Sequence, residues 1–316
     1  MSEGNIKINP LTIILGPTAS GKTRLAVSIA QKLGTEIISA DSRQIFRGMD
    51  IGTGKDLAAY EINGQKIPYH LIDIKDAGQR YHVSEFKTDF YSAFDKISAK
   101  HVIPILCGGT GMYVNSILQN HAFTEIPVNE HLRAELNGLP IEDLKQKLTG
   151  FPVEHTMHAD QSTVKRLIRA IEVATYLQNN ELNDIDRAKI NPFVIGLKDE
   201  VAIRRRKIEQ RLMQRLDDGM IEEVRNLLDA GVPAEILTFY GLEYKLVVSY
   251  LEQQIDYLQL KTQLFNSICQ YAKRQMTFFR KMEKDGVNIH WYQADMDFEN
   301  LSGTVLSDIE RHFLVS

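Results

Sequence analysis

The chain has 316 residues, of which 43% are hydrophobic and 25% charged, and its formal net charge is −4. This composition is typical of a globular protein and excludes a disordered chain, a collagen-like sequence and a disulfide-rich scaffold. The apolar runs are far shorter than the ~20 residues of a membrane span. Because the sequence shows no secretory leader and has only two cysteines, Cys107 and Cys269, we expect a cytoplasmic protein with no membrane contact.

Short apolar runs alternate with helical patterns over the first part of the chain. We predict strands over residues 11–15, 36–39, 69–74 and 102–107, and helices over 22–33 and 83–99. In the second of these helices the apolar residues recur at a spacing of three to four, which is typical of a helix with one buried face. The alternation predicts a parallel β-sheet with helices on both faces, and therefore an α/β fold.

The strand pattern disappears between residues 123 and 191. Helical patterns over 141–148 and 161–177 replace it, so we predict a helical insertion domain there. The core resumes with a strand over 193–197, a helix through an arginine-rich run, a long helix over 259–283 and a strand over 288–292. The predicted organisation is a core of residues 1–122 and 192–316, interrupted by the insertion 123–191.

A glycine-rich motif lies between the first predicted strand and the first predicted helix. It fits the pattern G-x-x-x-x-G-K-[ST] of a P-loop and consists of Gly16, Pro17, Thr18, Ala19, Ser20, Gly21, Lys22 and Thr23. In such a loop the backbone N–H groups surround a polyphosphate at the helix N-terminus, Lys22 neutralises its charge, and the Thr23 hydroxyl offers a ligand to Mg²⁺. A P-loop core with Mg²⁺ as cofactor is therefore predicted, the alternative being a glycine turn with no ligand.

An acidic residue follows the second predicted strand. Asp41 is expected at the carboxyl end of the sheet near the P-loop, where a carboxylate can accept a proton from a hydroxyl or an amine. The pair Asp41-Ser42 is equally well explained as a cap of the next element. The second acid that holds Mg²⁺ in many P-loop enzymes is missing, because the run 102–107 ends in Gly108-Gly109-Thr110-Gly111. That loop either approaches the same site or forms a simple tight turn.

Basic residues gather in two places despite the acidic total. The first cluster is Arg204, Arg205, Arg206, Lys207, Arg211 and Arg215, and the second is Lys273, Arg274, Arg280, Lys281 and Lys284. Such clusters bind a phosphate backbone, although a solvated helix face explains Arg204–Arg206 equally well. Arg211 shares a helix face with Arg204 and can reach phosphates in the P-loop. Aromatic residues lie among the bases of 271–280, as in RNA-binding surfaces, but we expect Phe278 and Phe279 in the core.

Taken together, these motifs resemble the tRNA dimethylallyltransferase family, also called tRNA isopentenyltransferases. The resemblance runs from about residue 11 to 285. Its residues are Gly16–Thr23, Ser39–Phe46, Met49–Lys55, His70–Asp73, Gly108–Tyr113, Arg166–Val173, Tyr240-Gly241 and Lys273–Thr277. The chain departs from the family pattern at Thr53-Gly54-Lys55-Asp56, where Thr-Ala-Lys-Pro is usual.

The resemblance implies an enzyme that transfers a dimethylallyl group from dimethylallyl diphosphate to N6 of adenosine 37, next to the anticodon of tRNA. It implies that the P-loop holds a diphosphate leaving group, with Lys22, Arg211 and Mg²⁺ at Thr23 stabilising its charge, while Asp41 accepts the proton and Thr110 positions the reacting groups. The insertion would grip the anticodon stem-loop, and the protein would act as a monomer. The implied tRNA contacts are Asp41, Ser42, Arg43, Gln44, Thr110, Arg133, Lys165, Arg166, Leu167, Ile168, Arg169, Lys273, Arg274 and Gln275.

Two other functions remain open on the residues alone. A P-loop kinase that binds ATP and phosphorylates a nucleoside or a small alcohol would use Asp41 as its base and would turn over ATP without tRNA. An RNA-binding protein without catalysis would keep the P-loop for structure only. The joint presence of Lys22, Asp41 and Thr110 argues against the second of these.

Overall fold

The computed structural model describes residues 9–62, 64–119, 122–124, 126–157, 159–181 and 187–314. The chain divides into two compact units: residues 1–118 with 188–316, and residues 119–187. The boundaries of the units lie a few residues before those we predicted at 122/123 and 191/192.

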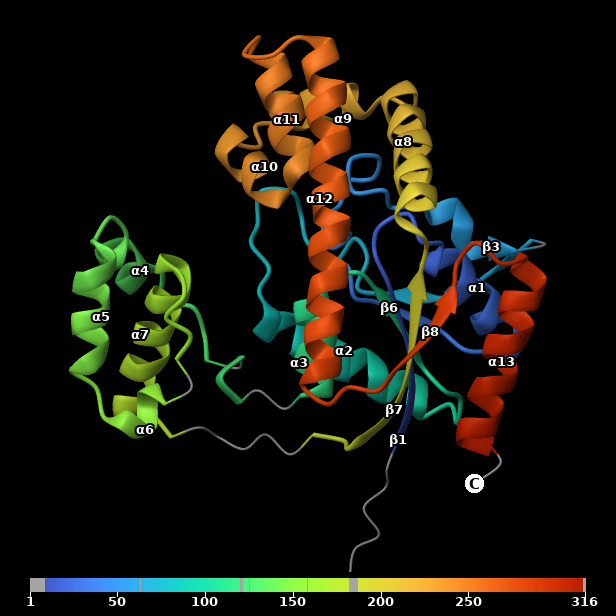
Figure 1. Cartoon of the computed structure of the whole chain (residues 1–316), viewed down its shortest axis with the longest axis horizontal. Coiled ribbons are helices and arrows are strands. Elements are labelled where there is room, and N and C mark those ends of the chain that lie inside the picture. Colours follow the sequence, from blue (N-terminus) through green and yellow to red (C-terminus); the bar gives the residue numbers. More distant parts are fainter. Residues whose placement is uncertain are drawn as a thin grey trace, which may run out of the picture. The chain divides into compact units, whose positions relative to one another are not determined.

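The larger unit is built on a six-stranded parallel sheet, as the α/β prediction requires (Figure 1). Its strand order is β5-β2-β6-β1-β7-β8. The strands are β1 (Asn9–Leu15), β2 (Ile37–Ser39), β5 (Tyr69–His70), β6 (Ile105–Gly108), β7 (Ile190–Lys198) and β8 (Ile289–Gln293). The ladder pairs β1 with β6 on one side and with β7 on the other. Because all strands are parallel, their carboxyl ends meet at one edge of the sheet, where ligands bind in open α/β folds.

Side chains of successive residues in a strand point to opposite faces, and both faces of this sheet are buried. Ile13 of β1 therefore packs into one core and Ile14 into the other. The first core is covered by α2 (Val83–Ser98), α3 (Gly111–Leu118) and part of α12 (Tyr257–Lys284). The second is covered by α1 (Lys22–Leu33) and α13 (Phe298–Leu314). The helices predicted over 22–33, 83–99 and 259–283 are confirmed, and Phe279 lies in the first core as expected.

Two predicted strands are too long. The strand predicted over 69–74 ends at His70, because Leu71 and Asp73 both adopt positive φ, a backbone conformation that no strand continues through. The strand predicted over 102–107 begins only at Ile105, since Pro104 has no amide N–H for the ladder. Between β2 and β5 the chain forms a 3₁₀ turn, η1 (Leu57–Tyr60), and two short antiparallel strands, β3 (Glu61–Ile62) and β4 (Gln65–Lys66).

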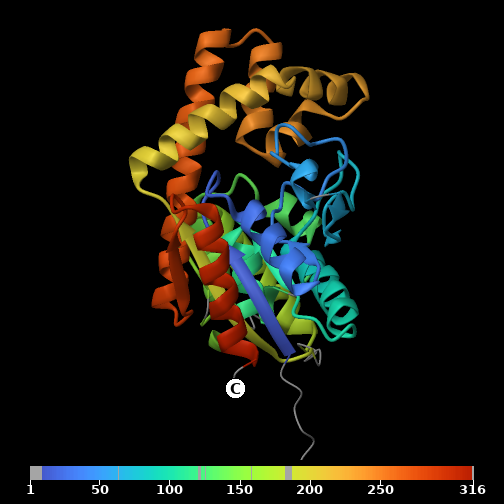
Figure 2. The ribbon, with the colours of Figure 1, turned by 90° about the vertical axis from the view of Figure 1, so that its right-hand side faces the viewer.

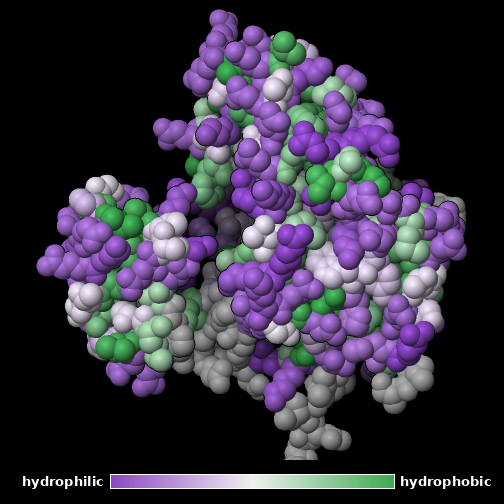
Figure 3. Space-filling view, viewed as in Figure 1, coloured by the Kyte–Doolittle hydropathy of each residue, from purple (hydrophilic) through white to green (hydrophobic). Residues whose placement is uncertain are grey.

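A helical layer stands beyond the carboxyl edge of the sheet (Figures 1 and 2). It consists of α8 (Val201–Asp217), α9 (Met220–Asp229), α10 (Ala234–Tyr240) and α11 (Leu242–Leu251). The long helix α12 starts in this layer, where Asp256 and Gln259 form a capping box, and returns past the edge to the sheet. The surface over α12 is mostly hydrophilic (Figure 3). In the part of the chain described, no helix is long and apolar enough to cross a bilayer.

The smaller unit is helical, as predicted for the insertion. It contains η2 (Ala122–Thr124), α4 (Glu130–Leu136), α5 (Ile141–Thr149), α6 (Val153–Thr156) and α7 (Val164–Asn179). Its own core is formed mainly by leucines, among them Leu136 from α4, Leu144 and Leu148 from α5, and Leu167 from α7. The apolar residues of α5 and α7 face this core at helical spacing, which is the pattern that made both helices predictable.

Candidate active site

The P-loop occupies the turn between β1 and α1 at the carboxyl edge of the sheet. Gly21 is the N-cap of α1 and has φ +82°, a conformation that favours glycine and lets the chain enter the helix from a tight loop. The Lys22 Nζ donates to the Pro17 carbonyl over 2.7 Å, so its ammonium lies inside the loop. Burial lowers the pKa of Lys22 to about 8, although the nearby Asp41 carboxylate acts in the opposite direction. The arrangement offers a helix N-terminus and a lysine to one anion.

Asp41 follows β2 directly and reaches the same edge. The Asp41 Oδ1 accepts a hydrogen bond from the Arg43 amide at 3.0 Å, and the Asp41 amide donates to Ser39 Oγ at 3.3 Å. These bonds fix the turn, and the second carboxylate oxygen has no hydrogen-bond partner among the described residues, so Asp41 is both a turn residue and an available carboxylate. The two interpretations of Asp41 that the sequence left open are therefore compatible.

The loop after β6 packs against the segment that carries Asp41. The Thr110 amide donates to the Ala40 carbonyl at 3.2 Å, and Thr110 Oγ1 accepts from the Ser42 amide at 3.0 Å. A Cβ at Gly108 would overlap the backbone of Ala40, so glycine allows this close approach. Thr110 thus holds the turn of Asp41 and Ser42 in place, and the loop is more than a simple tight turn.

The helix α12 closes this region through Gln275. Its Oε1 accepts from the Thr18 amide at 2.8 Å, and its Nε2 donates to the Gly109 carbonyl at 2.9 Å. Gln275 therefore links the P-loop to the loop after β6. We predicted Gln275 as a tRNA contact, but in this structure both ends of its amide bind the protein itself.

Arg211 of α8 reaches the site from the helical layer. Its Nη2 donates to the Gly54 carbonyl at 2.9 Å, and burial lowers the pKa of its guanidinium. The loop that it contacts is held by Glu223 of α9, which accepts hydrogen bonds from the amides of Asp50, Ile51 and Gly52 at 2.6–2.9 Å. The predicted approach of Arg211 to the P-loop agrees with this position.

One pocket brings these groups together. The predicted site residues that line it are Thr18, Lys22, Thr23, Asp41, Arg43, Gln44, Arg211 and Gln275. Its walls also include residues to which we assigned no role, namely Thr53, Gly54, Tyr60, Cys107, Arg215, Glu243 and Tyr271. Glu243 accepts from Arg43 Nη1 at 2.6 Å, and the Arg43 guanidinium lies over the Tyr271 ring. Among these residues, Arg215 has a signal in the sequence: it lies four positions after Arg211 and therefore on the same face of the helix.

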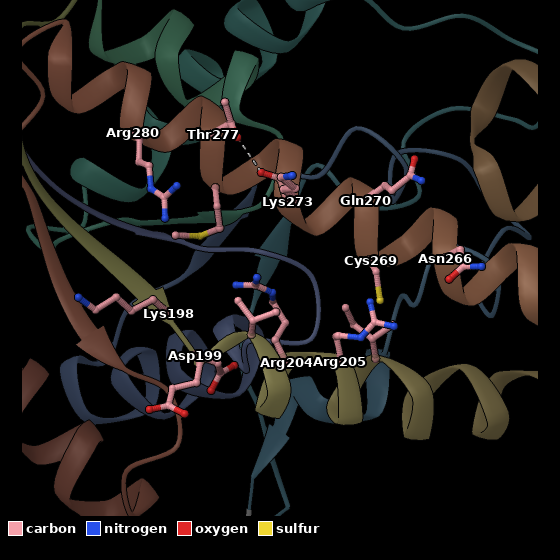
Figure 4. A pocket seen from close by; sticks show the side chains of 14 residues that line it. Lys198, Asp199, Arg204, Arg205, Asn266, Cys269, Gln270, Lys273, Thr277 and Arg280 are labelled. Carbon is pink, nitrogen blue, oxygen red and sulfur yellow. Dashed lines mark hydrogen bonds between the residues drawn. The ribbon is translucent and has the colours of Figure 1, made fainter.

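A second, basic groove lies between α8 and α12 (Figure 4). Arg204 and Arg205 project from α8 toward α12, and Arg280 extends from α12 into the space between the two helices. Lys273 lines the same groove, and its neighbour Arg274 is exposed. Two residues of each basic cluster, Arg204 with Arg205 and Lys273 with Arg280, therefore line this groove, which favours a polyanion as its ligand.

In the smaller unit, the structure changes the meaning of several predicted tRNA contacts. Leu167 and Ile168 are buried in the core of this unit, so their side chains are not on the surface, and the tRNA contact expected at these two positions stays a prediction. Arg133 and Arg169 both pair with Glu172, whose side chain is 1% exposed. Lys165 and Arg166 are exposed, and Arg166 pairs with Asp160 at 2.6 Å. Of the five consecutive positions 165–169, only the first two are exposed.

We expect Glu172→Gln to destabilise the smaller unit by about 2–4 kcal/mol, because two arginines would lose their carboxylate. Burial by itself raises the pKa of Glu172, but hydrogen bonds from Arg133, Arg169 and the Asn129 amide bring it below its usual value. A carboxyl with a lowered folded pKa stabilises the fold above its unfolded pKa of about 4.3, and this contribution disappears as the pH falls.

Hydrogen exchange of the α7 amides in the full chain measures this effect, at pH 7 and at stepwise lower pH. The variant should exchange faster at pH 7 and show a weaker pH dependence. Glu142→Gln, at an exposed surface pair with Lys145, is the matched control and should change little. Equal protection of α7 in the Glu172→Gln variant and the unchanged protein would contradict the role of the network.

Comparison with known proteins agrees with this geometry. The family model described as IPP transferase matches residues 44–282, and the one described as isopentenyl transferase matches residues 9–71. The tRNA dimethylallyltransferase 1 of Porphyromonas gingivalis is 50% identical over 281 residues, which are 89% of this chain and 93% of the relative. The tRNA dimethylallyltransferase 2 of Bacteroides fragilis is 48% identical over 289 residues, 92% of this chain and 94% of the relative.

Solved structures show the same architecture. The full-length tRNA isopentenylpyrophosphate transferase of Bacillus halodurans has a TM-score of 0.69 and 30% identity, and the likeness covers 96% of each chain. A eukaryotic dimethylallyltransferase acting on tRNA has a TM-score of 0.75 at 18% identity, covering 96% of this chain and 80% of that chain. At such low identity the second likeness concerns the fold alone.

Proposed function

We propose that N6 of adenosine 37 accepts the dimethylallyl group that this chain, a member of the IPP transferase family, transfers to tRNA. The donor is dimethylallyl diphosphate, and the products are N6-(dimethylallyl)adenosine and diphosphate. The observation that carries this proposal is that one pocket contains the P-loop lysine, a carboxylate and a half-buried arginine, which are Lys22, Asp41 and Arg211.

The pocket suits a diphosphate leaving group. Lys22 and the amides at the start of α1 bind its terminal phosphate, and Arg211 lines the same pocket. An allylic C–O bond breaks with cationic character on carbon while negative charge grows on the diphosphate, so cations placed beforehand lower the barrier. No phosphoryl group moves in this reaction, and this agrees with a loop after β6 that carries Thr110 in place of an acid.

The carboxylate of Asp41 is suited to proton transfer. As the bond between the allylic carbon and N6 forms, the nitrogen loses a proton, and Asp41 accepts it. The electron pair of the broken C–O bond leaves with diphosphate, so the step balances without a further reactant. Thr110 contributes by orienting the turn of Asp41 and Ser42, because its hydroxyl accepts a hydrogen bond from the Ser42 amide at 3.0 Å.

The residues present also fit Mg²⁺. This ion prefers oxygen ligands, keeps several waters and is bound mostly through substrate phosphates, so it needs few protein ligands. The Thr23 hydroxyl lies in the pocket beside Lys22, and the described residues hold no group of three His, Cys, Asp or Glu side chains that would favour another metal. We propose that Thr23 holds Mg²⁺ together with the diphosphate, where the ion stabilises the leaving group.

For the reaction, the adenine of the anticodon loop must reach Asp41. An adenine in a single-stranded loop leaves its stack at a cost of a few kcal/mol, which contacts to the neighbouring phosphates offset. We propose that the groove between α8 and α12, with Arg204, Lys273 and Arg280, supplies such contacts. The exposed Lys165 and Arg166 of the smaller unit supply others.

A paired assay of the purified protein tests the proposal. One reaction contains Mg²⁺, dimethylallyl diphosphate and unmodified tRNA, and the other contains Mg²⁺, ATP and a panel of nucleosides, with products identified by mass. We expect prenylated adenosine in the tRNA reaction only, and loss of product when EDTA removes Mg²⁺. Fragmentation of the tRNA should place the group at adenosine 37. Phosphorylated nucleoside with unaltered tRNA would replace this function with that of a kinase.

A further inference from the structure

A second arginine faces the pocket one helical turn after Arg211. Arg215 of α8 is 8% exposed and lines the same pocket as Lys22 and Thr23. Its Nε has no hydrogen-bond partner among the described residues, and its Nη1 lies 3.7 Å from Glu243 Oε1, too far for a hydrogen bond. A buried guanidinium with so few partners is costly unless an anion completes its surroundings.

The loop opposite Arg215 leaves room for this side chain. Gly54 has φ +65°, and a Cβ at this position would overlap the guanidinium groups of both Arg215 and Arg211. The glycine therefore lets both arginines approach the loop, and Arg211 donates to its carbonyl. Through this approach the two guanidinium groups share one wall of the pocket.

The charges of the pocket do not balance without a ligand. It has four cationic and two anionic side chains: Lys22, Arg43, Arg211 and Arg215 against Asp41 and Glu243. Glu243 gives its short contact of 2.6 Å to Arg43 and its longer one to Arg215. Burial, and the neighbouring Arg211 charge, lower the pKa of Arg215 to about 10, which is the effect expected for a cation without a matching anion.

We propose that Arg215 and Arg211 form a pair that binds the phosphate next to the allyl group of the allylic diphosphate, while the P-loop and Lys22 bind the terminal phosphate. The inference rests on the proposed function, since it names how that substrate is recognised. Guanidinium groups suit this task because their planar forks bind phosphate oxygens with two parallel hydrogen bonds. The arginine pair would make the pocket selective for a diphosphate over a monophosphate, and it would stabilise charge on the leaving group.

Calorimetry on the full chain with Mg²⁺ tests the pair. The probes are inorganic diphosphate, dimethylallyl diphosphate and dimethylallyl monophosphate, and tRNA binding is measured in parallel. Arg215→Met removes the charge but keeps an unbranched side chain. We expect it to lower the affinity for both diphosphates by about 10- to 100-fold, the range for losing hydrogen bonds to a charged group. The affinities for the monophosphate and for tRNA should stay unchanged.

Two further variants make the result decisive. Arg215→Lys keeps the charge and loses the fork, so its loss of diphosphate affinity should be intermediate, and it replaces Arg215→Met if that variant does not fold. Arg225→Met, at an exposed arginine of α9, is the matched control and should bind like the unchanged protein. Unchanged diphosphate affinity in the Arg215 variants would overturn the arginine pair alone. Absence of diphosphate binding by the unchanged protein would instead overturn the proposed function.

Discussion

Replacing Asp41 with asparagine is expected to lower kcat by about 10²- to 10⁴-fold, the usual contribution of a positioned general base. Asparagine keeps an oxygen that can accept the Arg43 amide, a hydrogen bond of 3.0 Å that fixes the turn after β2. The turn should therefore persist while the proton acceptor is lost. Single-turnover prenylation of tRNA, with the affinities for diphosphate and tRNA measured separately, checks this expectation.

A loss of turnover without a loss of binding distinguishes a proton acceptor from a residue that only caps the turn. If Asp41 only capped the turn, asparagine would serve nearly as well and kcat would hardly change, whereas alanine would disturb both binding and turnover. Asp76→Asn, at an exposed surface pair with Arg47, is the matched control and should leave kcat unchanged. Normal turnover by Asp41→Asn would show that another group accepts the proton from N6.

Sequence patterns located the parts of this protein that depend on neighbouring residues. The helix after the P-loop begins at Lys22 in both prediction and structure. Gly21 marks the start of the helix, and an amphipathic pattern follows it. The strand predicted over 69–74 failed for the opposite reason. Leu71 and Ile72 are buried, but they pack into different cores from a loop, and a contact between Lys55 and Asp73, 18 positions apart, holds that loop.

The candidate site shows the same limit. Lys22 and Asp41 each carry a local signal, a glycine-rich loop or a strand end, and both were identified. Glu243 carries none, because its role depends on Arg43, 200 positions away. Gln275 was expected only through the family resemblance, and its bond to Thr18, 257 positions away, has no signal in the sequence. The spacing of Arg211 and Arg215 was visible in the sequence. That both reach the pocket depends on the space left by Gly54, which only the folded chain reveals.

Lys22→Met is expected to weaken the binding of diphosphate, whereas Asp41→Asn slows turnover. It removes the P-loop cation, so we expect the affinity for diphosphate to fall and kcat/KM to drop by about 10²- to 10³-fold, as when one donor to a developing anion is lost. Methionine keeps an unbranched side chain in the buried position and gives up the hydrogen bond to the Pro17 carbonyl. Calorimetry with inorganic diphosphate and steady-state prenylation, each with tRNA affinity as a reference, measure the effect.

Lys32→Met provides the control within the same helix, since Lys32 is exposed in the last turn of α1 and contacts Ser302. It should bind diphosphate normally. The two pocket variants together separate the functions of neighbouring residues. Loss of the lysine should lower the affinity for the diphosphate leaving group. Loss of the carboxylate should lower the rate at which N6 attacks. If Lys22→Met bound diphosphate as tightly as the unchanged protein, the diphosphate would lie outside the P-loop, and the role proposed for Lys22 in binding it would be wrong.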